Sequence, residues 1–145
     1  GFTLVELIVV IAIIGVLAAI LVPSLLGYVK KSKVSAMNAN AKDVFDAINT
    51  SLIELDSQGE TISKYDGDES KWDDDLKNAI VNYFKDINNS KYTFKSFIDG
   101  GACVATAASD GTYWGSYPTG NDVAHAKNEP SLTAAGVTLG GGSTT

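Results

Sequence analysis

The sequence has 145 residues, enough for one domain. Hydrophobic residues make up 45% of it and the net charge at pH 7 is −6, so nucleic-acid binding through phosphate neutralisation is not expected. All 11 basic residues are lysine, which leaves no guanidinium for bidentate recognition of phosphate. With Cys103 as the single cysteine, an intramolecular disulfide and a cysteine-based zinc site are both excluded.

The first predicted element is an apolar helix. Residues 7–22 form an apolar run interrupted only by the small Gly15, and Glu6 is the only charge within residues 2–26. As a helix, residues 2–26 would be about 38 Å long at a rise of about 1.5 Å per residue, which spans a hydrocarbon core of about 30 Å. The polar flank at residues 27–31 does not fit the cleavage site of a secretory signal peptide.

Glu6 is the anomaly in this helix. A carboxylate at the centre of a membrane costs roughly 2.5–3.5 kcal/mol, and less near an interface. A segment that served only as an anchor would gain nothing from Glu6. The acid therefore predicts a functional role with a specific partner.

The N-terminal residues also carry a family resemblance. The start Gly-Phe-Thr-Leu-Val-Glu over residues 1–6, followed by an apolar run that contains Gly15 and ends near Pro23, closely resembles the N-terminus of type IV pilins and the related pseudopilins. The likeness covers about the first 30 residues, and the rest of the chain is similar only in architecture.

The resemblance implies roles for five residues. A prepilin peptidase would cleave between Gly1 and Phe2 and methylate the new amine of Phe2. Glu6 would pair with the Phe2 amine of a neighbouring subunit. The helix would bend or lose helicity between Gly15 and Pro23. Glycine weakens a helix and proline removes a backbone donor, which agrees with the last expectation.

Helical spacing continues beyond the apolar run. Apolar residues recur at steps of three or four and predict one long helix over residues 3–56, ended by Gly59. The stripe that faces the domain consists of Val34, Met37, Ala41, Val44, Ile48, Leu52 and Leu55. The opposite, polar face carries Lys30, Lys33, Asp43, Asp46 and Asn49.

A second amphipathic helix is predicted over residues 71–88, after a polar loop. Ser70 would be its N-cap, with Asp73 three residues later as an approximate capping box. Acidic residues in its first turn suit the helix dipole. Its apolar positions are Trp72, Leu76, Ile80, Phe84 and Ile87.

The rest of the pattern favours strands. Residues 92–99, 102–109 and 112–117 predict a three-stranded antiparallel meander, with Gly-Gly and Asp-Gly turns between them. Cys103 is interpreted as a small apolar residue in the second strand, with an exposed or intermolecularly paired thiol as the alternative. Residues 118–122 are expected to be a loop, and Ser131 onward is small and glycine-rich.

The fold class expected from these elements is α+β, with a long N-terminal helix packed on a small antiparallel meander and a second short helix between them. The expected organisation is a transmembrane or filament-core segment at 1–27, a globular domain at 28–139 and a flexible tail at 140–145.

Neither a metal site nor an enzyme is expected, and no cofactor is implied. The acids between residues 66 and 75 do not follow the EF-hand pattern, because Lys71 stands where that pattern needs glycine. His125, the only histidine, has no serine or cysteine partner visible in the sequence.

Three functions remain open. The first is a subunit that polymerises into a pilus filament on the cell surface, after a stage as a single-pass protein of the cytoplasmic membrane, with help from an assembly machinery and its ATPases. The filament would support adhesion, surface motility or DNA uptake. The second is a pseudopilin of a secretion or competence system, although Tyr117-Pro118-Thr119 lies far downstream of the position typical of its major subunits. The third is a monomeric membrane-anchored binding protein.

Overall fold

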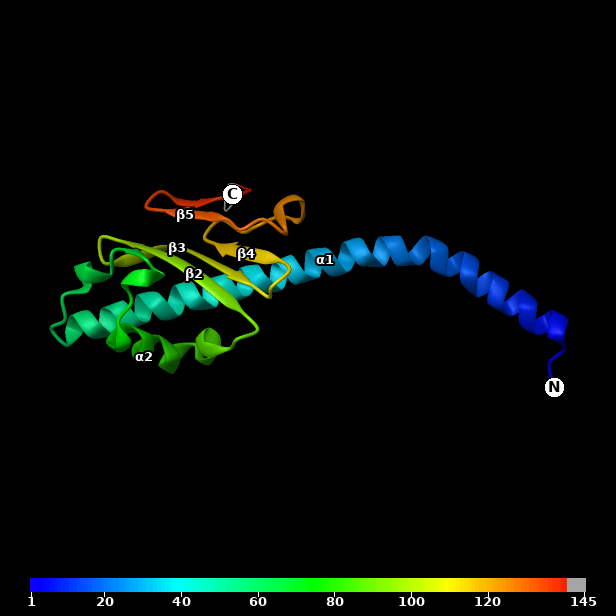
Figure 1. Ribbon diagram of the computed structural model, residues 1–145, viewed down its shortest axis with the longest axis horizontal. Coiled ribbons are helices and arrows are strands. Elements are labelled where there is room, and N and C mark those ends of the chain that lie inside the picture. Colours follow the sequence, from blue (N-terminus) through cyan, green and yellow to red (C-terminus); the bar gives the residue numbers. More distant parts are fainter. Residues whose placement is uncertain (141–145) are drawn as a thin grey trace.

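The structure, a computed structural model, describes residues 1–140 and has the predicted α+β architecture. Helix α1 (Leu4–Ser57) runs along a four-stranded antiparallel sheet of order β1-β2-β3-β4, and helix α2 (Asp74–Tyr83) lies beside it (Figure 1). The strands are β1 (Gly67–Asp68), β2 (Thr93–Asp99), β3 (Ala102–Ser109) and β4 (Trp114–Tyr117). A separate hairpin consists of β5 (Ser131–Thr133) and β6 (Gly136–Thr138). Short 3₁₀ helices are η1 (Ile62–Tyr65), η2 (Glu69–Lys71), η3 (Lys85–Asn88) and η4 (Val123–His125).

The C-terminal end of α1 is where the sequence predicted it. Gly59 follows the helix with φ +90°, a backbone conformation that glycine adopts without a Cβ penalty. Its N–H donates to the Asp56 carbonyl at 3.0 Å, and the Glu60 N–H donates to the Leu55 carbonyl at 3.0 Å. These two bonds form a Schellman motif and satisfy carbonyls that the helix end would otherwise leave unpaired.

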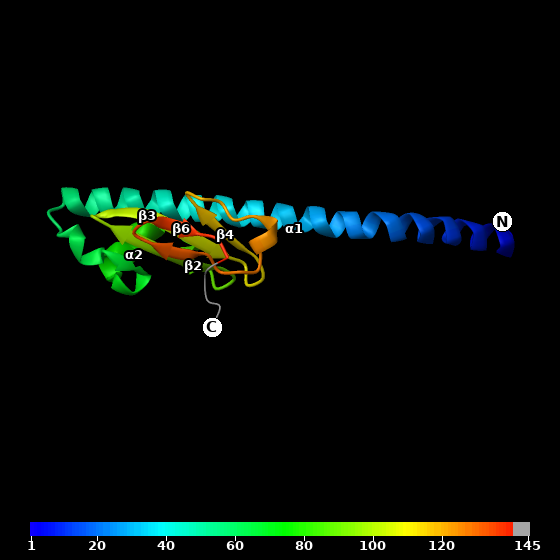
Figure 2. The same ribbon diagram turned by 90° about the horizontal axis from the view of Figure 1, so that it is seen from above.

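The core lies between the second half of α1, helix α2 and one face of the sheet. All seven residues of the predicted α1 stripe are buried, which confirms that face of the helix. Ala105 to Ser109 of β3 are buried without alternation, because α1 covers one face of the strand and the β5–β6 hairpin the other (Figure 2). Thr106 donates to the Ala41 carbonyl of α1 at 2.6 Å, so this strand is bonded directly to the helix.

Close backbone approach joins α1 to β4. A Cβ on Gly115 would lie 2.1 Å from the backbone of Met37 and Asn38, so only glycine fits there. The Asn38 Oδ1 accepts the N–H groups of Ser116 and Asn121 at 2.8 and 2.9 Å, and its Nδ2 donates to the Asn121 carbonyl at 3.0 Å. One amide therefore satisfies three backbone groups of β4 and the loop after it.

Asn49 corrects the assignment of the polar helix face. The sequence placed it with the solvent-facing residues, but its Oδ1 accepts the Cys103 N–H at 2.9 Å. Its side chain thus accepts a hydrogen bond from the backbone of β3, as the Asn38 side chain does from the backbone of β4. Asparagine looks polar in a helical pattern whether it faces water or a backbone, which explains the error.

Helix α2 is shorter than predicted. It begins after Asp73, which is the N-cap in place of Ser70, and it ends at Tyr83 because Phe84 is extended (φ −146°, ψ 93°). Trp72, Phe84 and Ile87 belong to the flanking turns, and they still pack against the core as predicted. The periodic apolar pattern continues through these 3₁₀ turns, so it did not reveal where the α-helix stops.

The strand predictions need three corrections. The β3–β4 connection is not a two-residue turn, because Ser109 pairs with Trp114 and residues 110–113 form the loop. Asp110 Oδ1 accepts the N–H groups of Thr112 and Tyr113 and closes this loop. The glycine-rich stretch from Ser131 forms the β5–β6 hairpin, and β1 adds a fourth strand to the meander. Of the tail predicted at 140–145, residues 141–145 lie outside the described part of the chain.

Asp73 connects three elements. Its Oδ1 accepts the Leu76 N–H at 3.0 Å and the hydroxyl of the fully buried Tyr65 at 2.8 Å. Its Oδ2 lies 3.0 Å from the Lys64 ammonium. Partial burial raises the pKa of Asp73, but the bonds from Leu76, Tyr65 and Lys64 outweigh it and lower the pKa to about 2.

We expect Gly115→Ala to destabilise the domain by at least the roughly 1–3 kcal/mol typical of overpacking, because the new methyl meets backbone atoms that cannot rotate away. Thermal unfolding of the chain in detergent measures this. Gly27→Ala is the matched control, since a Cβ at Gly27 meets nothing within 4 Å. Equal melting temperatures for the two variants would contradict the close approach of α1 and β4.

We expect Asp73→Ala to lower the free energy of unfolding by about 1–3 kcal/mol, because it removes a helix cap and leaves the buried Tyr65 hydroxyl unpaired. Asp73→Asn keeps one carbonyl oxygen, which can still accept both the Leu76 N–H and the Tyr65 hydroxyl, and should cost less. Because the folded-state pKa of about 2 lies below the ordinary 3.8, the stabilisation by the charged form is present above pH 3.8 and lost as the pH falls toward 2. Unfolding measured from pH 6 to about 2 should therefore show a smaller pH dependence in Asp73→Asn than in the parent. Identical pH profiles would show that the charge contributes nothing.

Candidate functional site: the N-terminal segment of helix α1

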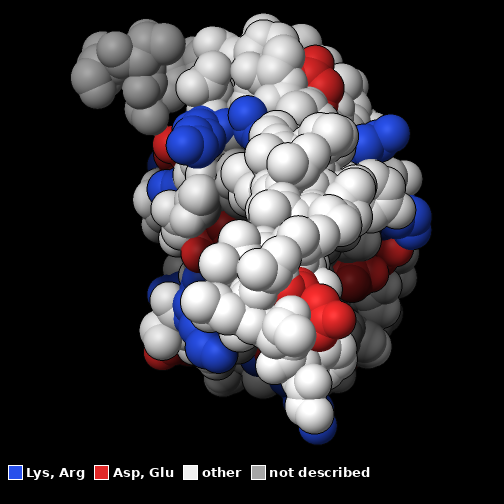
Figure 3. Space-filling view, turned by 90° about the vertical axis from the view of Figure 1, so that its right-hand side faces the viewer, with Lys and Arg blue, Asp and Glu red and all other residues white. Residues whose placement is uncertain are grey.

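The candidate site is the part of α1 that projects beyond the globular domain (Figure 1). We call residues 2–26 the apolar segment. Its most hydrophobic window of 18 residues has a mean hydropathy of 3.1, and none of that window is buried. Leu7, Ile14 and Leu26 are between 54% and 65% exposed. Seen from the N-terminal end, largely uncharged surface runs through the middle of the view, with charged groups set around it (Figure 3).

This exposure is incompatible with water as the only neighbour. Burial of one Val, Leu or Ile side chain is worth about 1.5–3 kcal/mol, so the whole segment represents tens of kcal/mol. Helix α1 is long and apolar enough to cross a membrane. The segment therefore needs either lipid or other protein around its whole circumference.

Glu6 lies in the first turn of α1 and forms a capping box with Thr3. The Thr3 N–H donates to Glu6 Oε2 at 2.9 Å, and the Glu6 N–H donates to Thr3 Oγ1 at 3.1 Å. The sequence analysis missed this local role, although the spacing Thr-x-x-Glu is its known signature. The acid stands in the first turn of the helix, at the positive end of its dipole.

Gly1 and Phe2 precede the helix. Phe2 is 87% exposed, and the described Glu6 contacts within one chain are with Thr3. The predicted pairing of Glu6 with a Phe2 amine concerns a second subunit and stays a prediction.

Gly15 and Pro23 both lie inside the helix, which is continuous through them in the single chain. The projecting half of α1 is curved (Figure 1). Pro23 cannot donate its backbone hydrogen bond, and a Cβ on Gly15 would meet nothing within 4 Å. Loss of helicity between these residues inside a filament stays a prediction.

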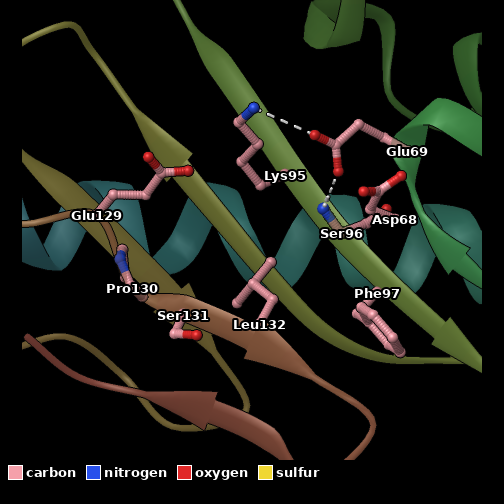
Figure 4. Close-up of a pocket in the computed structure, with 9 residues that line it drawn as sticks. All are labelled: Asp68, Glu69, Lys95, Ser96, Phe97, Glu129, Pro130, Ser131 and Leu132. Atoms are coloured by element: carbon pink, nitrogen blue, oxygen red, sulfur yellow. Dashed lines mark hydrogen bonds and ion pairs between the residues drawn. The ribbon is translucent and has the colours of Figure 1, made fainter. Parts of the chain in front are cut away.

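A pocket of about 380 Å³ lies between η2, β2 and β5 (Figure 4). Part of its polar wall is bonded within the chain, since Glu69 accepts the Ser96 N–H at 3.1 Å and lies 3.2 Å from the Lys95 ammonium, while the buried Ser96 hydroxyl has no partner among the described residues. The residues that line it belong to a packing junction between the sheet and the β5–β6 hairpin.

Four of the six acids from Asp66 to Asp75 accept backbone N–H groups. Asp66 accepts the N–H groups of Gly100 and Gly101, Asp68 caps η2 and Asp73 caps α2. Within residues 1–140, no group of three His, Cys, Asp or Glu side chains is arranged to hold a metal ion. His125 pairs with Asp122 at 2.7 Å at the start of η4.

Cys103 is a buried free thiol, 3% exposed, in β3. Burial raises its pKa to about 12, so the thiol stays protonated and unreactive at neutral pH. This confirms its interpretation as a small apolar residue in a strand.

Comparisons with known proteins concern mainly the N-terminal part. Residues 1–22 match the family described as the prokaryotic N-terminal methylation motif. The type IV major fimbrial protein FimA of Dichelobacter nodosus is 39% identical over 67 residues, 46% of this chain and 43% of FimA. The type IV major pilin protein PilA of Myxococcus xanthus (strain DK1622) is 43% identical over 56 residues, 39% of this chain and 26% of PilA.

A longer and weaker match is the type IV major pilin protein PilE1 of Neisseria gonorrhoeae, 28% identical over 111 residues, 77% of this chain and 54% of PilE1. The chain thus spans between about a quarter and a half of the length of these relatives. No solved structure matches it significantly.

The fold and the exposed segment define the class of protein: an α+β domain carried on a long helix whose first half is built to be covered by lipid or by other chains. Within this class, the methylation motif and the relatives show that the chain is similar to type IV major pilins, above all in its N-terminal part.

We expect a chain that starts at Tyr28 to be soluble and monomeric. The first buried residue is Val34, so the truncation removes the apolar segment and keeps the whole core. The full chain should require detergent or assembly into filaments. Size-exclusion chromatography with light scattering measures the difference. A stable oligomer of the truncated chain would show that the main assembly contacts lie in the globular domain.

Proposed function

We propose that the chain is a structural subunit that polymerises into a type IV pilus through helix α1. The observation that carries the proposal is the apolar segment, which starts with the methylation motif and is exposed around its whole circumference. Before assembly, the subunit is a single-pass protein of the cytoplasmic membrane and lipid covers the apolar segment. Other copies of the same segment cover it in the filament at the cell surface.

Glu6 sets the register between subunits in this proposal. The peptidase cut between Gly1 and Phe2 creates an amine four residues before the carboxylate of Glu6. Opposite charges about 4 Å apart attract by about 4 kcal/mol at an effective dielectric of 20, which offsets much of their desolvation. Only one axial stagger of neighbouring helices brings the amine and the carboxylate together.

Gly15 and Pro23 provide local adaptability. Neighbouring helices cannot all remain straight when they also carry bulky domains. A stretch between a glycine and a proline unwinds at low cost, provided that neighbours cover the freed backbone groups. The prepilin peptidase, the assembly machinery and its ATPases are the partners of this scheme. Adhesion, surface motility and DNA uptake are the roles that such a filament supports.

Glu6 variants test the pairing and separate it from helix capping. Glu6→Gln keeps the side-chain acceptor of the capping box but removes the charge. Thr3→Ala weakens the same capping box but keeps the charge. We expect Glu6→Gln and Glu6→Val to reach normal membrane levels and to lose most of the filament yield, because an unpaired amine then lies in an apolar core. We expect Thr3→Ala to assemble.

The measurement is filament mass in a sheared-cell fraction against subunit mass in the membrane fraction, with electron microscopy of the filaments. Normal yield in Glu6→Gln would contradict the charge pair. Equal loss in Glu6→Gln and Thr3→Ala would point to the capping box instead. Filaments that are short, or that appear only on overexpression, would favour a pseudopilin.

A further inference from the structure

The charges of the chain are separated along its length. Lys30, Lys31 and Lys33 follow the apolar segment directly and give that stretch a charge of +3. We call them the basic collar. Residues 34–145 carry eight lysines and 16 acids, a net charge of −8. The domain is therefore strongly acidic, whereas the basic collar lies where the domain meets the apolar segment.

The basic collar has no ion-pair partner in the described part of the chain. Four ion pairs of lysine with carboxylate and one His–Asp contact occur within residues 1–140, and none involves Lys30, Lys31 or Lys33. Lys31 and Lys33 are exposed, Lys30 is half-buried, and the buried core begins at Val34. Three ammonium groups thus surround α1 where it leaves the domain, with Asp110 of the β3–β4 loop close enough to Lys33 to interact with it electrostatically.

The opposite end of the domain is acidic. Asp56, Glu60, Asp66 and Asp99 lie around the C-terminal end of α1 and the β2–β3 turn, and we call them the acidic pole. Asp66 accepts the N–H groups of Gly100 and Gly101, which holds the β2–β3 turn against this end of the helix. Figure 1 shows both segments at the end of the domain farthest from the N-terminus. Asp56 and Asp99 are exposed and have no ion pair within residues 1–140.

The two ends cannot neutralise each other within one chain. Lys31 and Asp56 lie on the same helix, about 37 Å apart at a rise of about 1.5 Å per residue. That distance is several times the Debye length of about 8 Å at physiological salt. A second copy displaced along the helix axis brings the opposite charges together.

We propose that the basic collar is an interaction surface for a second copy of this chain, whose acidic pole docks against it end to end. The inference rests on the proposed filament. The collar is continuous with the apolar segment that copies cover in that filament, so any chain packed there passes close to it. Because the collar and the pole are different surfaces of one chain, their pairing is heterologous and propagates into an open filament.

An anionic membrane surface is the competing partner for lysines beside an apolar helix. The acidic domain argues against it, because residues 34–145 with their charge of −8 directly adjoin the collar and are repelled by anionic headgroups. The same negative charge attracts the basic collar of another copy of the chain.

Three variants of the full chain, expressed in cells that assemble filaments, test the inference. The collar-reversed variant carries Lys30→Glu, Lys31→Glu and Lys33→Glu. The control carries Lys77→Glu, Lys85→Glu and Lys91→Glu, which change the net charge equally at exposed lysines without ion pairs in the described part of the chain. The rescue variant adds Asp56→Lys and Asp99→Lys to the collar-reversed chain. Sheared filament mass and membrane subunit mass are measured for each.

We expect the collar-reversed variant to lose filament mass about tenfold or more at normal membrane levels, as several weak ion pairs per contact become repulsions. The control should assemble normally, and the rescue variant should recover most of the loss. Filaments of the unaltered chain should also dissociate more readily at high salt than at low salt.

Normal filament yield in the collar-reversed variant would overturn the inference, and so would equal losses in the collar-reversed and control variants. A lower membrane level of the collar-reversed variant would indicate that the three lysines bind lipid, and it would overturn the inference as well. Absence of filaments from the unaltered chain is a different result, because it would overturn the proposed function itself.

Discussion

Helix α1 must present an apolar surface on all sides in its first half and on one side in its second half. The second half is covered by the sheet and by α2, and its stripe from Val34 to Leu55 is buried within the chain. The first half has no cover within the chain. One continuous helix thus couples a folded domain to a surface that only lipid or other chains can cover, and the remaining features of the molecule serve this coupling.

The domain is fixed firmly to the helix, and this has mechanical consequences. Gly115 allows β4 to touch the α1 backbone, and Asn38 and Thr106 bond the helix to β4 and β3. These contacts begin only a few residues after the basic collar. Any rotation or axial shift of the apolar segment is therefore transmitted to the domain while the helix stays intact. The proposed unwinding between Gly15 and Pro23 would relieve this constraint, since glycine and proline are the weakest helix formers in the apolar segment.

The sequence predicted the elements that depend on periodic patterns and missed those that depend on single contacts. The α1 stripe and its end at Gly59 follow from apolar spacing and backbone conformation, and both are local. Asn49 facing Cys103 depends on a partner distant in sequence, which no local pattern reveals. The β5–β6 hairpin is local, with Ser131 paired to Thr138, but its small and glycine-rich strands lack the alternating apolar pattern that predicts a strand. In the candidate site, Glu6 stood out as the single charge in an apolar run and again through the resemblance, while its capping box with Thr3 was visible in the spacing and overlooked.

The capping box would change the energetics of the proposed pairing between Glu6 and the Phe2 amine of a neighbouring chain. In the single chain, the carboxylate already accepts the Thr3 N–H at 2.9 Å, so it is not a bare charge when the segment lies in lipid. An amine from a neighbouring chain does not have to displace this bond, because a carboxylate has two oxygens with about four acceptor positions. Oε2 can hold the helix start while Oε1 receives the amine. The Glu6 carboxylate is thus oriented before assembly. The contact between subunits would therefore lose less side-chain conformational entropy than a contact with a mobile Glu6.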